Sequence, residues 1–95
     1  MRVTWTKGAL SDLRDIVRYI ELRNPKAALR VKQRIIMSSR QLREYPHSGT
    51  AVHRADTRKL VVTGLPYIII YRTIDGTVDI SDVIDARMDR APDLQ

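Results

Sequence analysis

The sequence contains no cysteine, which excludes disulfides and thiolate metal sites and predicts a reducing cytoplasm as the setting. No apolar run approaches the roughly 18 residues that a membrane-spanning helix needs, so a soluble protein without a membrane partner is expected. Repeats, low-complexity tracts and linkers are also missing. We therefore expect a single domain over residues 1–95, in which residues 85–95 form a polar C-terminal tail.

Acidic residues are scarce in most of the chain. Residues 1–74 hold fifteen Lys/Arg against five Asp/Glu, whereas residues 75–95 hold two against six, which gives a basic body of +10 and an acidic end of −4. A basic body predicts an acidic or polyanionic partner, either nucleic acid or an acidic protein segment. The acidic end argues against a surface that coats nucleic acid uniformly.

Two helices are predicted in the first half. The first runs from about Lys7 to Arg23 after a Thr6 cap, and the second starts at Asn24–Pro25 and runs to about Arg43. Their connection is so short that they must form an antiparallel hairpin. The apolar stripe of the first helix consists of Leu10, Leu13, Ile16, Val17 and Ile20.

Strands are predicted in the second half, around the aromatic and β-branched run Tyr67–Arg72, which is typical of a strand buried on both faces. Asp75–Gly76 then predicts a type I′ hairpin, because both central residues of that turn need positive φ. With Thr57–Thr63 and Thr77–Ile84 the run forms an antiparallel meander. Alternation breaks at Asp82–Ile84, which indicates either a β-bulge or an early strand end.

The predicted fold class is α+β, with a short N-terminal edge strand at Arg2–Thr6 and a two-helix hairpin packed on a small antiparallel sheet. A helical hairpin can cover only one face of that sheet. In the central strand Tyr67, Ile69 and Tyr71 point to one face, whereas Ile68, Ile70 and Arg72 point to the other. We therefore expect a partner chain, or the protein's own tail, to cover the second face.

No metal or cofactor site is predicted. His47 and His53 lie in one loop without a third ligand at a metal-binding spacing. In an unbroken strand Asp79 and Asp85 share a face and Asp82 takes the other, so these carboxylates do not converge on a cation. We expect neither a metal nor a cofactor.

Several short motifs follow one another along nearly the whole chain. They are Trp5 with Ala9 and Asp12-Leu13, Tyr19-Ile20, Asn24-Pro25 with Ala27-Ala28, Pro46 with Gly49, Thr57-Arg58, Gly64, Pro66-Tyr67, Tyr71-Arg72, and Ala86-Arg87 with Asp89. In this order and at these spacings they resemble the ParE/RelE superfamily of bacterial type II toxins, and the ParE branch more closely than the RelE branch.

The resemblance implies the toxin of a toxin–antitoxin pair, which arrests growth by inhibiting DNA gyrase through binding, without catalysis, and takes part in plasmid stabilisation. It also implies a cognate antitoxin with an acidic amphipathic segment, a toxin–antitoxin hetero-oligomer, and DNA binding through the antitoxin rather than directly. The alternative is a ribosome-dependent mRNA endonuclease of the RelE type. A third hypothesis is a small basic binding module without toxicity.

Candidate site residues follow from the resemblance and the charges. The second helix carries several basic residues and no acid, which indicates either a solvated face or a partner-binding surface. Candidate antitoxin contacts are Tyr67, Ile69, Tyr71, Arg30 and Arg34. Candidate target contacts are Arg58, Arg72, Asp85, Arg87 and Arg90.

An endonuclease would need a different set. Arg58, Lys59, Arg72 and Arg87 could stabilise phosphate charge. An acid or base is harder to find because no tyrosine or histidine follows Ile74, so Asp85 or Tyr67 would have to serve. Asp85 stands where ParE-like chains often have histidine. We expect it either to alter the target contact, which would make this a diverged or weak toxin, or to cap the tail or pair with Arg87 or Arg58.

Overall fold

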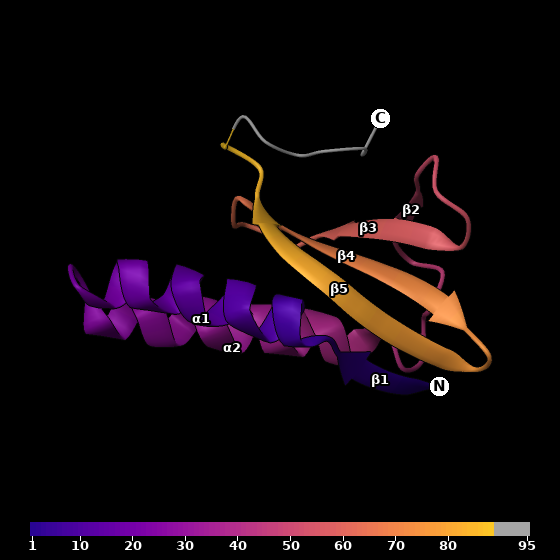
Figure 1. The fold of residues 1–95 in the computed structure, drawn as a ribbon. Coiled ribbons are helices and arrows are strands. Elements are labelled where there is room, and N and C mark those ends of the chain that lie inside the picture. Colours follow the sequence, from indigo (N-terminus) through magenta and orange to yellow (C-terminus); the bar gives the residue numbers. More distant parts are fainter. Residues whose placement is uncertain (89–95) are drawn as a thin grey trace.

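The computed structural model describes residues 1–88, with two helices packed side by side against one face of a five-stranded sheet (Figure 1). This is the predicted α+β class. Within the described residues neither helix is long and apolar enough to cross a membrane. The elements are β1 (Arg2–Trp5), α1 (Lys7–Glu21), α2 (Pro25–Gln41), β2 (Thr50–Ala51), β3 (Thr57–Val61), β4 (Tyr67–Ile74) and β5 (Thr77–Asp85).

Both helices begin at the predicted caps. The Thr6 hydroxyl accepts a hydrogen bond from the Ala9 backbone N–H at 3.0 Å. The Asn24 side-chain oxygen accepts one from Ala27 at 3.1 Å, and Pro25 follows it as the first helical residue. Each cap satisfies an N–H that has no partner inside its helix, which fixes where the helix starts.

The sheet has the strand order β1-β5-β4-β3-β2. Strands β3, β4 and β5 form the predicted antiparallel meander, and the turn between β4 and β5 has φ values of 47° at Asp75 and 76° at Gly76. Two features were not predicted. β1 pairs in parallel with β5, so the sheet is mixed, and β2 adds a two-residue strand beyond β3. The predicted position of β1 at an edge is confirmed.

Ser81 is the extra residue of a β-bulge in β5. Ile80 lies opposite Tyr71 and Asp82 lies opposite Ile70, so Ser81 has no partner in β4. Of the two explanations for the broken alternation, the bulge is confirmed. It also overturns the placement expected for an unbroken strand, because Asp85 now shares the face of Ile80, whereas Asp79 lies on the other face.

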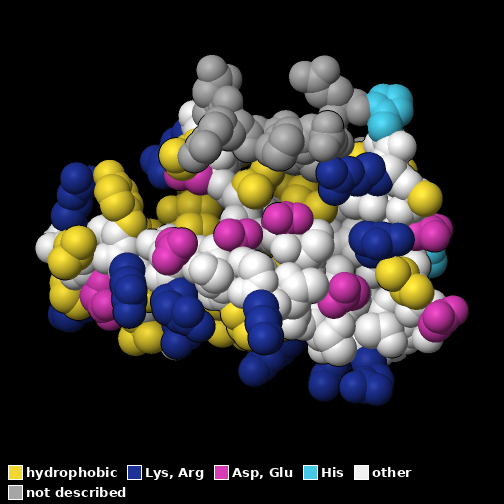
Figure 2. Space-filling model, viewed as in Figure 1, with side chains coloured by type: hydrophobic (Ala, Val, Ile, Leu, Met, Phe, Trp, Pro, Cys, Tyr) yellow, Lys and Arg dark blue, Asp and Glu magenta, His cyan; other side chains and the backbone are white. Residues whose placement is uncertain are grey.

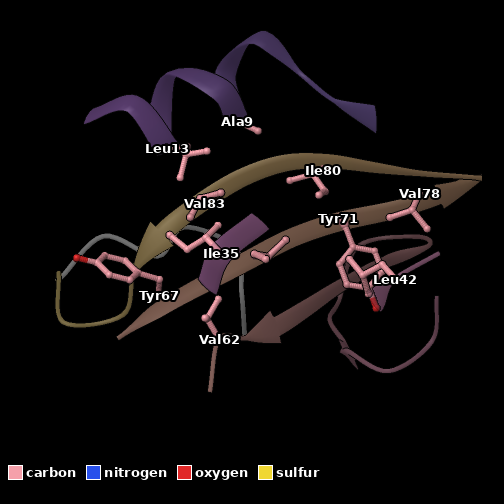
Figure 3. Packing of buried hydrophobic residues seen from close by; sticks show 11 residues of the cluster. Ala9, Leu13, Ile35, Leu42, Val62, Tyr67, Tyr71, Val78, Ile80 and Val83 are labelled. Carbon is pink, nitrogen blue, oxygen red and sulfur yellow. The ribbon is translucent and has the colours of Figure 1, made fainter. Parts of the chain in front are cut away.

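The hydrophobic core lies between the helices and the sheet (Figure 3). On the opposite sheet face Ile70 is buried and Ile68 is half-buried, whereas Arg72 is exposed. Val61 and Ile74 on that face are 58% and 39% exposed. The core residues are Ala9, Leu13, Ile35, Leu42, Val62, Tyr67, Ile69, Tyr71, Val78, Ile80 and Val83.

Asp12 connects α1 to β5, two residues beyond the bulge at Ser81. Its carboxylate accepts a hydrogen bond from the Val83 backbone N–H at 3.0 Å. Burial raises the pKa of Asp12 above its ordinary 3.8, the bond from Val83 opposes that rise, and the charges of Asp82 and Asp15 add to it. The contact therefore satisfies a backbone donor beside the bulge at an electrostatic cost.

We expect Asp12→Ala to lower the free energy of unfolding by about 1–2 kcal/mol, because the Val83 N–H loses its acceptor. Asp12→Asn keeps an acceptor oxygen and removes the charge, so it should retain most of the stability at pH 7. Urea unfolding of both variants measures the difference. Equal losses in the two would show that the hydrogen bond contributes little.

The two Asp12 variants also predict a pH dependence. Because the folded-state pKa is raised, folded Asp12 holds its proton more strongly than the unfolded chain does. Ionisation of Asp12 therefore lowers stability as the pH rises through the raised value, and this cost disappears below about 3.8. Wild type should gain stability relative to Asp12→Asn as the pH falls towards 4.

Candidate functional site

Three of the predicted antitoxin contacts belong to the protein's own core. Tyr67 is 5% exposed, and Ile69 and Tyr71 are fully buried beneath the helical hairpin. These three side chains lie on the sheet face that α1 and α2 cover. A partner could reach these side chains only by displacing the helices.

Arg58 is a structural contact of the loop that precedes β2. The Tyr71 hydroxyl donates to the Pro46 carbonyl at 2.8 Å and accepts from the Gly49 N–H at 2.9 Å. Opposite Tyr71, Arg58 donates to the Gly49 carbonyl at 2.8 Å and to the His47 carbonyl at 3.5 Å. Sequence motifs far apart in the chain thus meet around one buried tyrosine hydroxyl.

The basic residues considered for an endonuclease are not brought together. Arg58 shares the helix-covered face with Tyr71, whereas Lys59 and Arg72 lie on the opposite face. Arg87 follows the end of β5 near Tyr67, which is four residues from Tyr71 along β4, or about 13 Å. The described residues also contain no group of three or more His, Asp or Glu side chains that could hold a metal.

Asp85 pairs with Arg87, which is one of the outcomes expected from its sequence position. The Arg87 Nη2 lies 2.7 Å from Asp85 Oδ2, and Nε donates to Oδ1 at 3.0 Å. Hydrogen bonding from Arg87 lowers the pKa of the Asp85 carboxyl, although burial opposes this. The side chain of Asp85 is 17% exposed and that of Arg87 is 66% exposed. Candidate Arg90 lies outside the described residues.

Tyr67 remains protonated near neutral pH. Burial raises the pKa of its hydroxyl, and the negative charge of Asp85 raises it further. This direction is unfavourable for a general base. The two residues considered as an acid–base substitute therefore lie close to one another, but Asp85 is held as an anion by Arg87.

A groove runs between the helices, and none of its lining residues is among the candidates predicted from the sequence. Two adjoining hollows of about 320 Å³ and 350 Å³ share Leu10 and Leu13. Lys and Arg side chains gather over the helices along the lower side of the molecule in Figure 2. We call this the hairpin groove. Its apolar lining is Val3, Trp5, Leu10, Leu13, Val17 and Ile36, and its charged lining is Arg14, Arg18, Glu21, Lys32, Arg40 and Arg43.

One sequence signal could have revealed the hairpin groove. Leu10 and Val17 belong to the apolar stripe predicted for α1, but Leu10 is 45% exposed and both residues line the groove. The apolar arc of α1 is wider than the strip that packs on the sheet. An arc of that width indicates a second apolar contact beyond the protein's own core.

Arg30 and Arg34 line a separate hollow on the other side of α2. The hollow has a volume of about 420 Å³ and also includes Met37 and Leu65. Arg34 donates to the Thr63 carbonyl, which fixes it against the connection between β3 and β4. These two predicted antitoxin contacts are therefore accessible, unlike those in the core.

The order of strand, helical hairpin and sheet defines the RelE/ParE-like toxin fold. A chain of the chromosomal ParDE TA system from P. aeruginosa superposes with a TM-score of 0.82 at 21% identity, over 92% of this chain and 97% of that one. A chain of the intact E. coli RelBE toxin–antitoxin complex superposes with a TM-score of 0.62 at 16% identity, over 92% and 98% of the two chains.

Sequence comparison identifies the family. Residues 3–90 match the family described as the ParE toxin of the type II toxin-antitoxin system parDE. A Sinorhizobium fredii (strain NBRC 101917 / NGR234) protein named "Putative toxin Y4kP" is 45% identical over 85 residues, which cover 90% of this chain and 88% of that protein. The chain belongs to the ParE toxin family, and it is a type II toxin of a toxin–antitoxin system.

Proposed function

We propose that this toxin inhibits DNA gyrase by binding, without catalysis, and that a cognate antitoxin neutralises it by laying an acidic amphipathic segment into the hairpin groove. The observation that supports antitoxin binding is the hairpin groove itself. It combines an apolar floor with five basic side chains and one acidic side chain. Binding of this kind takes place in the cytoplasm, where the toxin, antitoxin and gyrase are made.

An amphipathic helix suits the hairpin groove better than an extended nucleic acid. Leu10, Leu13 and Ile36 offer an apolar surface, which a helix can meet with residues spaced three and four apart. Acidic side chains flanking that apolar face would pair with Arg14 and Arg40 at the rim. Nucleic acid would use the cations and leave the apolar floor without a contact.

Inhibition by binding is favoured over catalysis because the candidate basic residues are dispersed. Arg58 holds a loop, Arg72 lies on the opposite sheet face, and Arg87 is paired with Asp85. Phosphodiester cleavage needs an acid, a base and a cation around one phosphate. Membership of the ParE family supports gyrase as the target.

A supercoiling assay tests the proposal. Purified toxin should block supercoiling of relaxed plasmid by gyrase, and addition of the antitoxin should restore it. Induced expression without antitoxin should cause an SOS response and arrest growth. Plasmid supercoiling and mRNA integrity are measured in the same cells. Ribosome-dependent cleavage of mRNA with normal supercoiling would reject gyrase inhibition in favour of the RelE-type activity.

A further inference from the structure

Asp85 organises the turn that follows β5. The last ladder bond there runs from the Ala86 N–H to the Pro66 carbonyl at 2.7 Å. Beyond it the Met88 N–H donates to the Asp85 carbonyl at 3.0 Å, and the Arg87 N–H donates to Asp85 Oδ1 at 2.9 Å. The backbone of Arg87 is therefore fixed by the side chain two residues before it.

The same carboxylate also holds the Arg87 side chain. Nε and Nη2 of Arg87 donate to the two oxygens of Asp85 at 3.0 Å and 2.7 Å, which makes a bidentate pair. A guanidinium has five N–H donors, so this pair leaves three of them, including the fork of Nη1 and Nη2. Among residues 1–88 no other acceptor bonds to Arg87. The anion is mostly covered, and the cation faces outward.

Two tyrosines and a methionine lie in the neighbourhood of this cation. Tyr67 lies opposite Asp85 at the end of the β4–β5 ladder, and Tyr19 lies within electrostatic range of Arg87. Tyr19 is 59% exposed and carries Arg23 over its ring, with the guanidinium carbon 4.8 Å from the ring centre. Met88 is 56% exposed. Exposed tyrosine, arginine and methionine are enriched where proteins bind proteins.

We propose that Arg87 binds a carboxylate of the target protein, and that Asp85 is a positioning residue that holds the guanidinium in the orientation this contact needs. The fork of Nη1 and Nη2, which has no other acceptor among residues 1–88, matches a carboxylate in geometry. Asp85 cancels charge that a phosphate-binding surface would retain. A side chain held before binding loses less freedom when the complex forms. The inference rests on the proposed function, because it takes gyrase as that target.

The test compares wild type with Arg87→Ala, Asp85→Asn and the double variant in the supercoiling assay. Arg87→Ala should raise the half-inhibitory concentration about tenfold or more. Asp85→Asn keeps an acceptor for the Arg87 N–H but loses the charged pair, so an increase of about three- to tenfold is expected. The double variant should match Arg87→Ala alone, because Asp85 acts through Arg87.

Two further variants separate positioning from a structural role. Arg87→Lys keeps the charge without the fork and should inhibit as poorly as Arg87→Ala. Asp85→Glu keeps the charge and should restore part of the inhibition lost in Asp85→Asn. If Asp85→Asn weakens inhibition further in the Arg87→Ala background, Asp85 does not act through Arg87 and the proposal is overturned.

Other outcomes also overturn the inference. Inhibition by Asp85→Asn at or above the wild-type level would mean that Asp85 masks Arg87 instead of positioning it. Binding to plasmid DNA without gyrase that depends on Arg87 would identify a phosphate contact. If wild type fails to inhibit gyrase, the proposed function is wrong. Growth arrest on induction then tests Arg87 and Asp85 against whatever the target is, and equal arrest by all variants rejects their role.

Discussion

Gly49→Ala should lower the free energy of unfolding by about 2–4 kcal/mol. A methyl group at Gly49 would lie 2.7 Å from the Lys59 carbonyl oxygen and 2.7 Å from the Tyr71 hydroxyl oxygen. The carbonyl belongs to β3, and Tyr71 is fully buried, so neither can retreat easily. The loop must therefore move and lose its bonds to Tyr71 and Arg58.

Thermal and urea unfolding measure this effect, and a loss of that size should lower Tm by roughly 10–20 °C. Gly8→Ala is the matched control, because its nearest neighbours are 3.8 Å away and it lies in α1, where alanine is favoured over glycine. It should be neutral or stabilising. Gly49→Ala with wild-type stability would show that the loop is not held in place by Tyr71.

Reversing charge in the hairpin groove should weaken antitoxin binding about 100-fold or more. The variant is Arg14→Glu with Arg40→Glu, which changes one exposed side chain from each helix across the groove. Each new carboxylate would face an acidic residue of the antitoxin, and like charges at an interface cost several kcal/mol. Titration calorimetry with the protein encoded in the neighbouring reading frame measures the loss.

Two control pairs make the location of the antitoxin site testable. Lys7→Glu with Lys26→Glu carries the same change in net charge at helix starts outside the groove, where acidic residues are favoured. It should bind nearly as wild type does. Arg30→Glu with Arg34→Glu tests the hollow on the other side of α2. If only this last pair loses binding, the antitoxin uses the hollow chosen from sequence and not the hairpin groove.

Salt should separate charge from apolar contact in the same titration. Exposed ion pairs weaken as ionic strength rises, so wild-type affinity should fall with added salt. Arg14→Glu with Arg40→Glu should show a smaller or inverted dependence, because its groove rim no longer attracts acidic residues. Leu10→Ala should instead lower affinity by a similar factor at every salt concentration, since Leu10 contributes apolar surface to the groove.

Only part of the candidate site could be predicted from the sequence. The pairing of Asp85 with Arg87 was one of the expected outcomes, because the residues lie two apart and carry opposite charges. The hairpin groove was missed, since it depends on how α1 and α2 pack. Tyr67, Ile69 and Tyr71 were assigned to a partner although the helices bury them. A strand pattern identifies two faces but does not say which one the helices cover.

The sequence by itself determined what neighbouring residues decide: the caps at Thr6 and Asn24, the turn at Asp75–Gly76, the meander and the irregularity in β5. These features depend on φ preferences and on donors satisfied within a few residues. Only the tertiary structure decided the parallel pairing of β1 with β5, the strand β2, and the contacts of Asp12 and Tyr71. Each of these joins residues distant in the chain, so its free energy depends on the packing of the whole domain and leaves little local trace in the sequence.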